Sequence, residues 1–241
     1  IVDLPEGVTG KVLLWSSPLA LAEDPPQTLD ALGQGDARAR QAQHQKFLGK
    51  LNERLRSYTY LFPEPGRESA EFWVSPDMAA EAALRFVNMG FTAVKFDPAG
   101  PYTIRGGHDP SQSDITRSAA FCKAIRLAVG DRADLLLGTH GQFNVAGAIR
   151  LAQAIEPYGP LWYEEPIPPD NLLDFAEVQK AVRIPVATGE RFTTKAEFAT
   201  DLRTGGARIL QPTLGRAGGS GEAKKIAAIA EVFTAQMAPH R

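Results

Sequence analysis

From residue 56 onward the chain alternates short apolar runs with longer amphipathic segments, and this alternation limits the folds open to it. Seven runs read as β-strands, at residues 56–62, 92–97, 134–140, 161–165, 185–190, 207–212 and 234–239. Six segments between them carry helix signals, at residues 75–90, 114–129, 145–155, 172–182, 195–204 and 221–233. Strands and helices alternating at about 25 residues per unit indicate parallel strands joined by right-handed crossovers.

This alternation is shared by doubly wound sheets and by (β/α) barrels of the TIM type. Charged or hydrogen-bonding residues end one run after another, namely Asp97, His140, Glu164, Glu190 and His240. A barrel collects every strand end around one mouth, whereas a doubly wound sheet concentrates its site at one switch point, usually with a glycine-rich phosphate turn. Neither Gly-Gly pair, at 106–107 or 218–219, matches that turn. We therefore predict an α/β protein with a (β/α) barrel.

The bulk composition of the 241 residues excludes several functions. A net charge of −2 offers nothing that would draw the chain to nucleic acid or to an anionic membrane. The single cysteine, Cys122, rules out a disulfide framework and is expected in the core. We find no apolar run long enough to span a bilayer and expect no signal peptide, so the predicted location is the cytoplasm.

Two of the strand-end acids predict a divalent-cation site. Glu164 and Glu190 each close a short apolar run, and they are about one strand-helix-strand unit apart. Burying a carboxylate at the end of a strand costs desolvation energy unless a nearby cation compensates its charge. Oxygen ligands from neighbouring strand ends suit Mg²⁺. Glu165 faces the opposite way and is a candidate for a salt bridge.

The remaining candidates are basic or polar residues at the same strand ends. Lys95 is a base or an electrostatic partner, or else forms a structural pair with Asp97, which shares its side of the strand. His140 is predicted to be a metal ligand or a general acid, and His240 is a further strand-end histidine. Arg191, with Asp97, is predicted to bind the substrate, since a guanidinium recognises anions well.

Five segments in order resemble one family, the enolase superfamily, in its branch of mandelate racemase-like and muconate lactonizing-like enzymes and acid-sugar dehydratases. The resembling segments are residues 92–97 (TAVKFD), 162–166 (WYEEP), 187–190 (ATGE), 209–212 (ILQP) with Gly218-Gly219, and 238–240 (APH). The resemblance implies a modified (β/α)7β barrel with an α+β cap. It also implies Mg²⁺ held by three carboxylates and a base that removes the proton α to a substrate carboxylate, giving a metal-stabilised enediolate.

The resemblance assigns a role to each candidate. It implies that Glu164 and Glu190 are the second and third metal ligands, and that Lys95 is the first member of a Lys-x-Lys pair. His140 resembles the general acid of some sugar-acid dehydratases, and His240 resembles a histidine base on a later strand.

Three positions depart from the family pattern. Gly138 stands where the first metal ligand is normally an aspartate, Asp97 replaces the second lysine of the pair, and Thr213 replaces the aspartate partner of the late histidine. Residues 1–53 resemble only a partial N-terminal capping segment, and the barrel at 54–241 is expected to lack its last strand.

The leading hypothesis is a Mg²⁺-dependent carbon-oxygen lyase that dehydrates a small-molecule sugar acid, in a protein that forms a homo-oligomer. His140 is then the acid or a replacement metal ligand, and Lys95 or His240 is the base. A racemase or cycloisomerase with the same enediolate is the first alternative. A non-catalytic relative is the second, and a metal-free aldolase with Lys95 as a Schiff-base nucleophile is the third.

Overall fold

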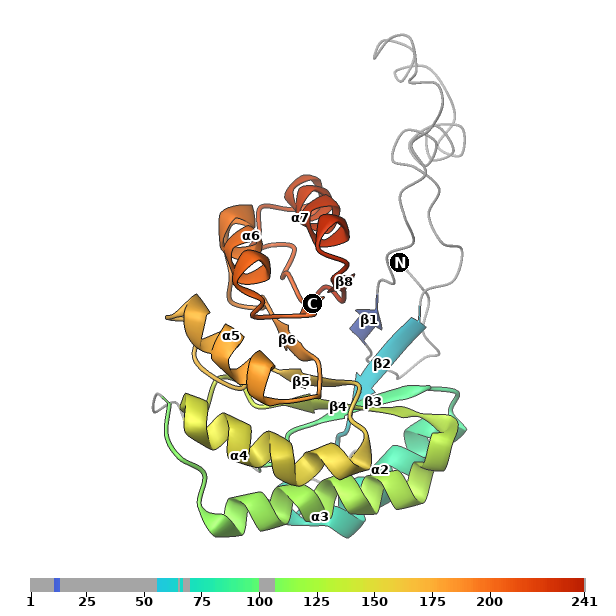
Figure 1. The fold of residues 1–241 in the computed structure, drawn as a ribbon. Helices are drawn as coiled ribbons and strands as arrows, with labels where there is room; N and C mark the ends of the chain where they lie inside the picture. Colours follow the sequence, from blue (N-terminus) through green and yellow to red (C-terminus); the bar gives the residue numbers. More distant parts are fainter. Residues whose placement is uncertain (1–10, 14–55, 65, 67–69, 100–106, 241) are drawn as a thin grey trace, which may run out of the picture.

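The strands form one curled sheet whose order follows the chain. The computed structural model describes residues 11–13, 56–64, 66, 70–99 and 107–240. A short strand, β1 (Lys11–Leu13), runs antiparallel to β2 (Arg56–Tyr60), and parallel ladders join each later strand to the one before it (Figure 1). The later strands are β3 (Ala93–Phe96), β4 (Asp134–Gly138), β5 (Trp162–Glu164), β6 (Val186–Thr188), β7 (Ile209–Leu210) and β8 (Gln236–Met237). The predicted (β/α) barrel architecture is confirmed; no ladder in the described part of the chain joins β8 back to β2.

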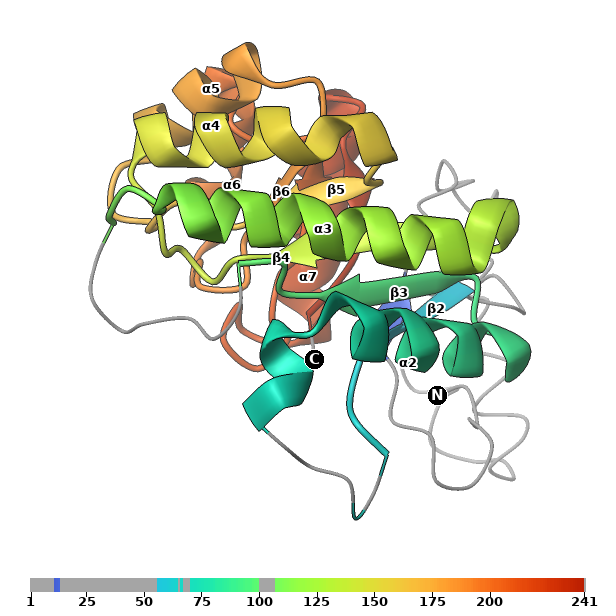
Figure 2. The ribbon, with the colours of Figure 1, turned by 90° about the horizontal axis from the view of Figure 1, so that it is seen from below.

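Helices cover the outer face of this sheet. They are α2 (Pro76–Asn88), α3 (Gln112–Val129), α4 (Val145–Ile155), α5 (Leu172–Ala181), α6 (Lys195–Thr204) and α7 (Ser220–Val232), with short 3-10 turns at η2 (Ala70–Val74), η3 (Gly130–Arg132) and η4 (Glu156–Tyr158). Figure 2 shows α2, α3 and α4 side by side across the outside of the early strands. The helix starts follow local chemistry: Ser75 caps α2, and Ser111 forms a reciprocal capping box with Asp114 at α3.

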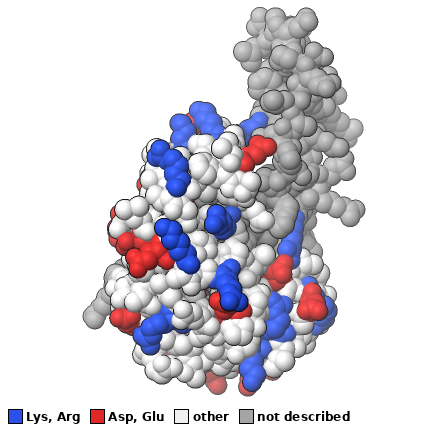
Figure 3. Space-filling model, viewed as in Figure 1, with Lys and Arg blue, Asp and Glu red and all other residues white. Residues whose placement is uncertain are grey.

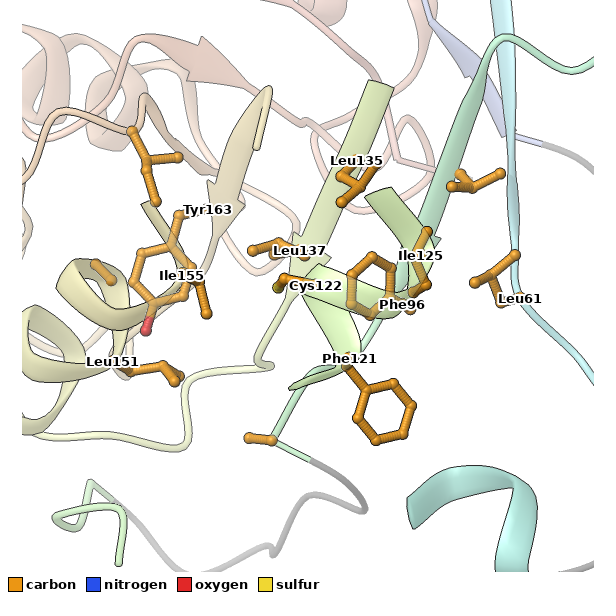
Figure 4. Packing of buried hydrophobic residues seen from close by; sticks show 14 of the residues in the cluster. Leu61, Phe96, Phe121, Cys122, Ile125, Leu135, Leu137, Leu151, Ile155 and Tyr163 are labelled. Atoms are coloured by element: carbon orange, nitrogen blue, oxygen red, sulfur yellow. The ribbon is translucent and has the colours of Figure 1, made fainter. Parts of the chain in front are cut away.

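Both faces of the sheet are buried, which explains why its strands are apolar runs without alternation. On the outer face, Phe96, Leu137 and Tyr163 pack against helix residues such as Ile125 and Leu151 (Figure 4). On the inner face, one residue from each of six strands and one from just after β8 form a single buried layer: Tyr58, Ala93, Leu136, Trp162, Ala187, Ile209 and Ala238. Tyr58 and Trp162 meet edge to face there, with ring centroids 5.5 Å apart.

The observed strands are shorter than the predicted ones at their carboxyl ends. Asp97, His140, Glu190 and His240 all lie just beyond the last residue of their strands. His140 adopts a left-handed backbone conformation with φ of 52°. Asp97, His140 and Glu190 leave the ladder because the chain turns at the barrel mouth toward the next helix, whereas His240 still forms an isolated parallel bridge with Thr213. The strand β1 was not predicted, and the proposed domain boundary at 53/54 lies outside the described residues.

Two simpler predictions can be compared with the structure directly. Cys122 is a free, buried cysteine in α3, as expected. Among the described helices, none combines the length and apolar character needed to cross a membrane. Lysine and arginine are interspersed with aspartate and glutamate on the face shown in Figure 3, in keeping with the small net charge.

Candidate active site

The candidate site is built on the layer directly above the buried inner layer. Because side chains of a strand alternate between its faces, the residue two places after each inner-layer residue also points inward. These positions hold polar groups or glycine on four neighbouring strands: Tyr60, Lys95, Gly138 and Glu164. Gln211, two places after Ile209, joins them from the end of β7. The change from apolar to polar residues at one level places the chemistry at the carboxyl ends of the strands.

Glu164 is a buried carboxylate, and both of its oxygens accept from donor groups. Two donors come from other strands and one from its own strand. Its Oε1 pairs with the ammonium group of Lys95, which is itself fully buried. Its Oε2 accepts hydrogen bonds from Trp162 Nε1 at 3.1 Å and from Gln211 Nε2 at 2.8 Å. A buried ion pair is tolerated when hydrogen bonds satisfy its remaining polar atoms. Lys95 and Glu164 therefore balance each other inside the barrel.

Asp97 lies beside this pair and is held by an aromatic hydroxyl. Tyr60 donates a hydrogen bond of 2.6 Å to Oδ1 of Asp97. Nδ1 of His140 lies 3.5 Å from the same oxygen. Burial and then the charge of Asp97 raise the pKa of Tyr60 well above its usual value, so this hydroxyl keeps its proton and remains a donor. Of the two predicted partners for Lys95, the structure shows Glu164, while Asp97 pairs with Tyr60.

The charge state of His140 depends on its neighbours. Burial of the ring lowers the pKa of His140, but the carboxylate of Asp97, whose Oδ1 lies 3.5 Å from Nδ1, raises it by more. The net result is a pKa above the usual value for histidine. A histidine in such a position is protonated more easily than a free imidazole and can deliver a proton to a leaving group.

Glu165 points away from Glu164, as the strand alternation predicted, and its salt-bridge partner is Arg191. The Nε atom of Arg191 donates to Oε2 of Glu165 at 2.9 Å. Burial raises the pKa of Glu165 to about 7, although the charge of Arg191 opposes the shift. Gly141, in a left-handed conformation with φ of 69°, leaves the room that the guanidinium group occupies.

The late strands contribute a second, more open cluster. Nε2 of His240 lies 3.3 Å from Oε2 of Glu190, and its Nδ1 lies 3.3 Å from Oγ1 of Thr213. Thr213 donates its own proton to the carbonyl oxygen of Glu190 at 3.0 Å, which leaves its oxygen to accept from the imidazole. Thr213 therefore takes the place of a carboxylate beside this histidine, as the sequence indicated.

The structure thus gathers the predicted residues into two groups and adds three that sequence reasoning missed. Lys95, Asp97, His140 and Glu164 belong to the early group, and Glu190 and His240 to the late one, while Arg191 lies against Glu165. The additional residues are Tyr60, Trp162 and Gln211. Their inward parity along each strand was the available signal. The catalytic and ligand roles of all these residues remain predictions.

The fit of the site to Mg²⁺ can be judged from its donors. Within the described ranges, no three His, Cys, Asp or Glu side chains cluster in a way that could hold a metal ion. Glu164 and Glu190, however, end neighbouring strands, and the charges of both act on Tyr58 and Glu165. Mg²⁺ often takes only one or two protein carboxylates and keeps water at its other positions. Both oxygens of Glu164 already take donors from Lys95, Trp162 and Gln211, so a site of two carboxylates would require Glu164 to exchange one of these partners for the ion. The side chain of Gly138 cannot supply a third ligand.

Comparison with known proteins gives a consistent family. The family model described as Enolase C-terminal domain-like matches residues 77–241. The D-gluconate/D-galactonate dehydratase of Picrophilus torridus is 36% identical over 196 residues, which cover 80% of this chain and 46% of that protein. The D-galactonate dehydratase of Variovorax paradoxus is 38% identical over 195 residues, covering 80% and 47%.

Solved structures point the same way. A mandelate racemase/muconate lactonizing enzyme-like protein from a Roseovarius species shares 68% identity with a TM-score of 0.78, covering 80% of this chain and 48% of that one. A mandelate racemase/muconate lactonizing enzyme from a Jannaschia species shares 66% identity with a TM-score of 0.77, covering 80% and 50%. The chain spans about half the length of these relatives. It belongs to the Enolase C-terminal domain-like family, in the mandelate racemase and muconate lactonizing enzyme branch of the enolase superfamily.

Proposed function

We propose that the protein containing this chain is a carbon-oxygen lyase that dehydrates a sugar acid. The curated relatives support the reaction class, because their names are D-gluconate, D-galactonate and D-xylonate dehydratase. Such a substrate carries a carboxylate with hydroxyl groups on the α and β carbons. Its dehydration breaks the α C–H bond and the β C–O bond, releases water, and leaves an enol that tautomerises to a 2-keto-3-deoxy acid.

The observation that carries the proposal is the pair of imidazoles at the mouth of the barrel. His140 follows β4 and His240 follows β8, so the two imidazoles come from opposite halves of the sheet. Each lies beside a carboxylate, Asp97 for His140 and Glu190 for His240. Dehydration needs one group to remove the α proton and another to protonate the departing hydroxyl. We assign the acid to His140, whose pKa is raised by Asp97. We assign the base to His240, whose Nε2 proton can pass to Oε2 of Glu190, 3.3 Å away, which leaves a neutral ring with a lone pair on Nε2.

The remaining site residues bind and orient the substrate in this proposal. Lys95 is fully buried against Glu164, which makes it a fixed countercharge and a poorer base than His240. Arg191 keeps a buried donor atom, Nη2, that has no hydrogen-bond partner among the described residues and can serve the substrate carboxylate. Asp97 lies within reach of the substrate hydroxyl groups beside His140.

We also propose that the protein uses Mg²⁺, held by Glu164 and Glu190. When bound, the ion would act as a Lewis acid that stabilises negative charge on the substrate carboxylate as the α proton leaves. Calorimetry of Mg²⁺ with the parent protein, with Glu164→Gln and with the less destabilising Glu190→Gln, each first shown to be folded by thermal unfolding, tests this separately from turnover. We expect heat of binding in the parent and its loss in both variants; absence of binding by the parent would refute the metal role.

Turnover itself is tested on a panel of sugar acids that includes gluconate, galactonate and xylonate. We expect one or more to yield a 2-keto-3-deoxy acid, and we expect His140→Asn and His240→Asn to abolish this product. Epimerised acid with deuterium at the α carbon in D₂O would instead indicate a racemase. No product and no Mg²⁺ binding would indicate a non-catalytic relative. A cytoplasmic location and a homo-oligomeric state remain part of the proposal.

A further inference from the structure

In the early group, Tyr60 has no role in the proposed reaction, although its hydroxyl contacts the carboxylate beside His140. Tyr60 on β2, Asp97 after β3 and His140 after β4 are linked in one line through a single oxygen, Oδ1 of Asp97. The hydroxyl of Tyr60 donates to Asp97, and the same carboxylate oxygen faces His140, so the carboxylate offers a path from the phenol to the imidazole. We propose that Tyr60 is a positioning residue that fixes the Asp97 carboxylate, and through it the orientation and tautomer of His140. The inference rests on the proposed function for the role of His140 as acid.

Gly138 makes this arrangement possible. A Cβ atom at position 138 would stand 2.6 Å from Oδ1 of Asp97 and 3.1 Å from the hydroxyl of Tyr60. Cε of Lys95 would also lie at 3.1 Å. All three distances are shorter than ordinary contacts, so any side chain at 138 would displace at least one of these neighbours, and the carboxylate, which is nearest, first. The glycine on β4 and the aspartate after β3 are therefore a matched pair: the carboxylate of Asp97 fills the space that a side chain at 138 would take.

The hydrogen-bond direction follows from which atoms carry protons. The hydroxyl of Tyr60 stays protonated, as its raised pKa requires, and it donates to Asp97. A carboxylate oxygen can only accept, so Nδ1 of His140 must carry a proton when it faces that oxygen. Nε2 is then the nitrogen that gives up or takes a proton. A fixed carboxylate thus presets which nitrogen of His140 performs the chemistry.

The inference is tested first without substrate, by ¹⁵N NMR of the imidazole rings. The chain has four histidines, and His140→Asn identifies the signal of His140 by its loss. In the neutral ring of the parent we expect the Nδ1-protonated tautomer to predominate. We expect Tyr60→Phe to reduce that population, because the freed carboxylate no longer holds Nδ1. An unchanged tautomer in Tyr60→Phe would overturn the inference.

The chain provides a matched control. Tyr58→Phe removes a phenol oxygen from a fully buried ring on the same strand, and that ring packs on Trp162. We expect it to leave the tautomer of His140 unchanged. Tyr60→Phe also keeps the aromatic ring that lies 5.3 Å from the ammonium of Lys95, so only the hydroxyl is lost. Equal tautomer changes in both variants would mean a general loosening of the site and would also overturn the inference.

Gly138→Ala gives an independent approach from the opposite side of the carboxylate. Its added methyl should push Asp97 away and reduce the Nδ1-protonated population as Tyr60→Phe does. Retention of the parent tautomer in a folded Gly138→Ala protein would contradict the matched pair. If thermal unfolding shows that this variant does not fold, Tyr60→Phe, which deletes one oxygen atom, decides the question.

Kinetics then separate this inference from the proposed function. With an accepted sugar acid, we expect Tyr60→Phe to lower kcat about tenfold and to change KM less than threefold, since the acid is misplaced while substrate contacts remain. A tautomer change with no turnover of any sugar acid would support the positioning role and refute the dehydratase. If Tyr60→Phe turns over a sugar acid with the kcat and the His140 tautomer of the parent, the dehydratase is supported and the positioning role of Tyr60 is refuted.

Discussion

The two halves of the barrel mouth treat their carboxylates differently. In the early half, from β2 to β5, Glu164 is buried and its oxygens are bound by Lys95, Trp162 and Gln211. In the late half, after β6 and β8, Glu190 and His240 form a more open pair whose side chains are 23% and 15% exposed. In the early half, the charges of Lys95 and Glu164 therefore cancel each other, and hydrogen bonds hold their side chains in place. In the late half the carboxylate of Glu190 is accessible to a ligand, although its imidazole, His240, is less exposed than His140 of the early half, at 15% against 27%.

The difference shows that a strand-end acid can have two physical roles. A buried carboxylate with several donors fixes the positions of neighbouring side chains, since any movement would leave a charge unpaired. An accessible carboxylate beside one histidine mainly tunes that histidine and is free to accept a ligand.

The largest effect is expected on turnover when either histidine is removed. His140→Asn and His240→Asn should each lower kcat by about 10² to 10⁴, the usual contribution of a general acid or base. The α-deuterium exchange rate distinguishes the halves. His240→Asn should abolish exchange because the base is lost, whereas His140→Asn should retain it. Loss of exchange in both variants would contradict the assignment of separate roles.

The next effect concerns stability. Glu164→Gln leaves the ammonium of Lys95 buried without its countercharge, and we expect a loss of about 3–5 kcal/mol in the free energy of unfolding. Glu190→Gln, in the open half, should cost about 1 kcal/mol or less. Urea unfolding measures both. The double variant Lys95→Met with Glu164→Gln should recover part of the loss; equal costs for the two single variants would remove the distinction between the halves.

A buried acid on the outer side of the late half sharpens the contrast. Asp201 in α6 is buried, and neither of its oxygens has a hydrogen-bond partner among the described residues. Burial raises the pKa of Asp201 from 3.8 to about 7. The folded state therefore binds the proton of Asp201 more tightly than the unfolded state does. The stability that this proton contributes to the folded protein is complete below about pH 4 and is lost as the pH rises to about 7.

Asp201→Asn should therefore match the parent near pH 4 and be more stable at pH 8. Across the interval the free energy of unfolding of the parent should fall relative to the variant by up to about 1.4 kcal/mol per pH unit. Urea unfolding at several pH values measures this. A difference that does not vary with pH would mean that the carboxyl group is ionised throughout and has a partner.

The smallest effect is expected at Thr213. Thr213→Val removes the oxygen that faces Nδ1 of His240 but leaves Glu190 beside Nε2. Because Glu190 still contacts His240, we expect kcat to fall only about twofold to fivefold. This is a smaller loss than for Tyr60→Phe, where Asp97 connects the phenol to His140. Steady-state kinetics of the two variants under the same conditions compare them. A larger loss at Thr213 would place the more demanding network in the late half.

Much of the fold could be predicted because it depends on patterns close together along the chain. The helices at Val145–Ile155 and Lys195–Thr204 have the predicted bounds, since their caps and apolar spacing are local. The strand ends were less predictable: His140 lies beyond β4 in a left-handed turn, which depends on the barrel mouth and not on strand propensity. The strand β1 depends on pairing with β2, far along the chain, and the residues alone did not indicate it.

The sequence by itself determined the parallel (β/α) sheet, the level at which apolar layers change to polar ones, and the identity of the acids and histidines at the strand ends. Alternation along each strand is a local property, so it can be read from residue spacing. The tertiary structure alone decided the partners. Lys95 pairs with Glu164 and leaves Asp97 to Tyr60, because strand register and the absence of a side chain at Gly138 set which atoms come within reach.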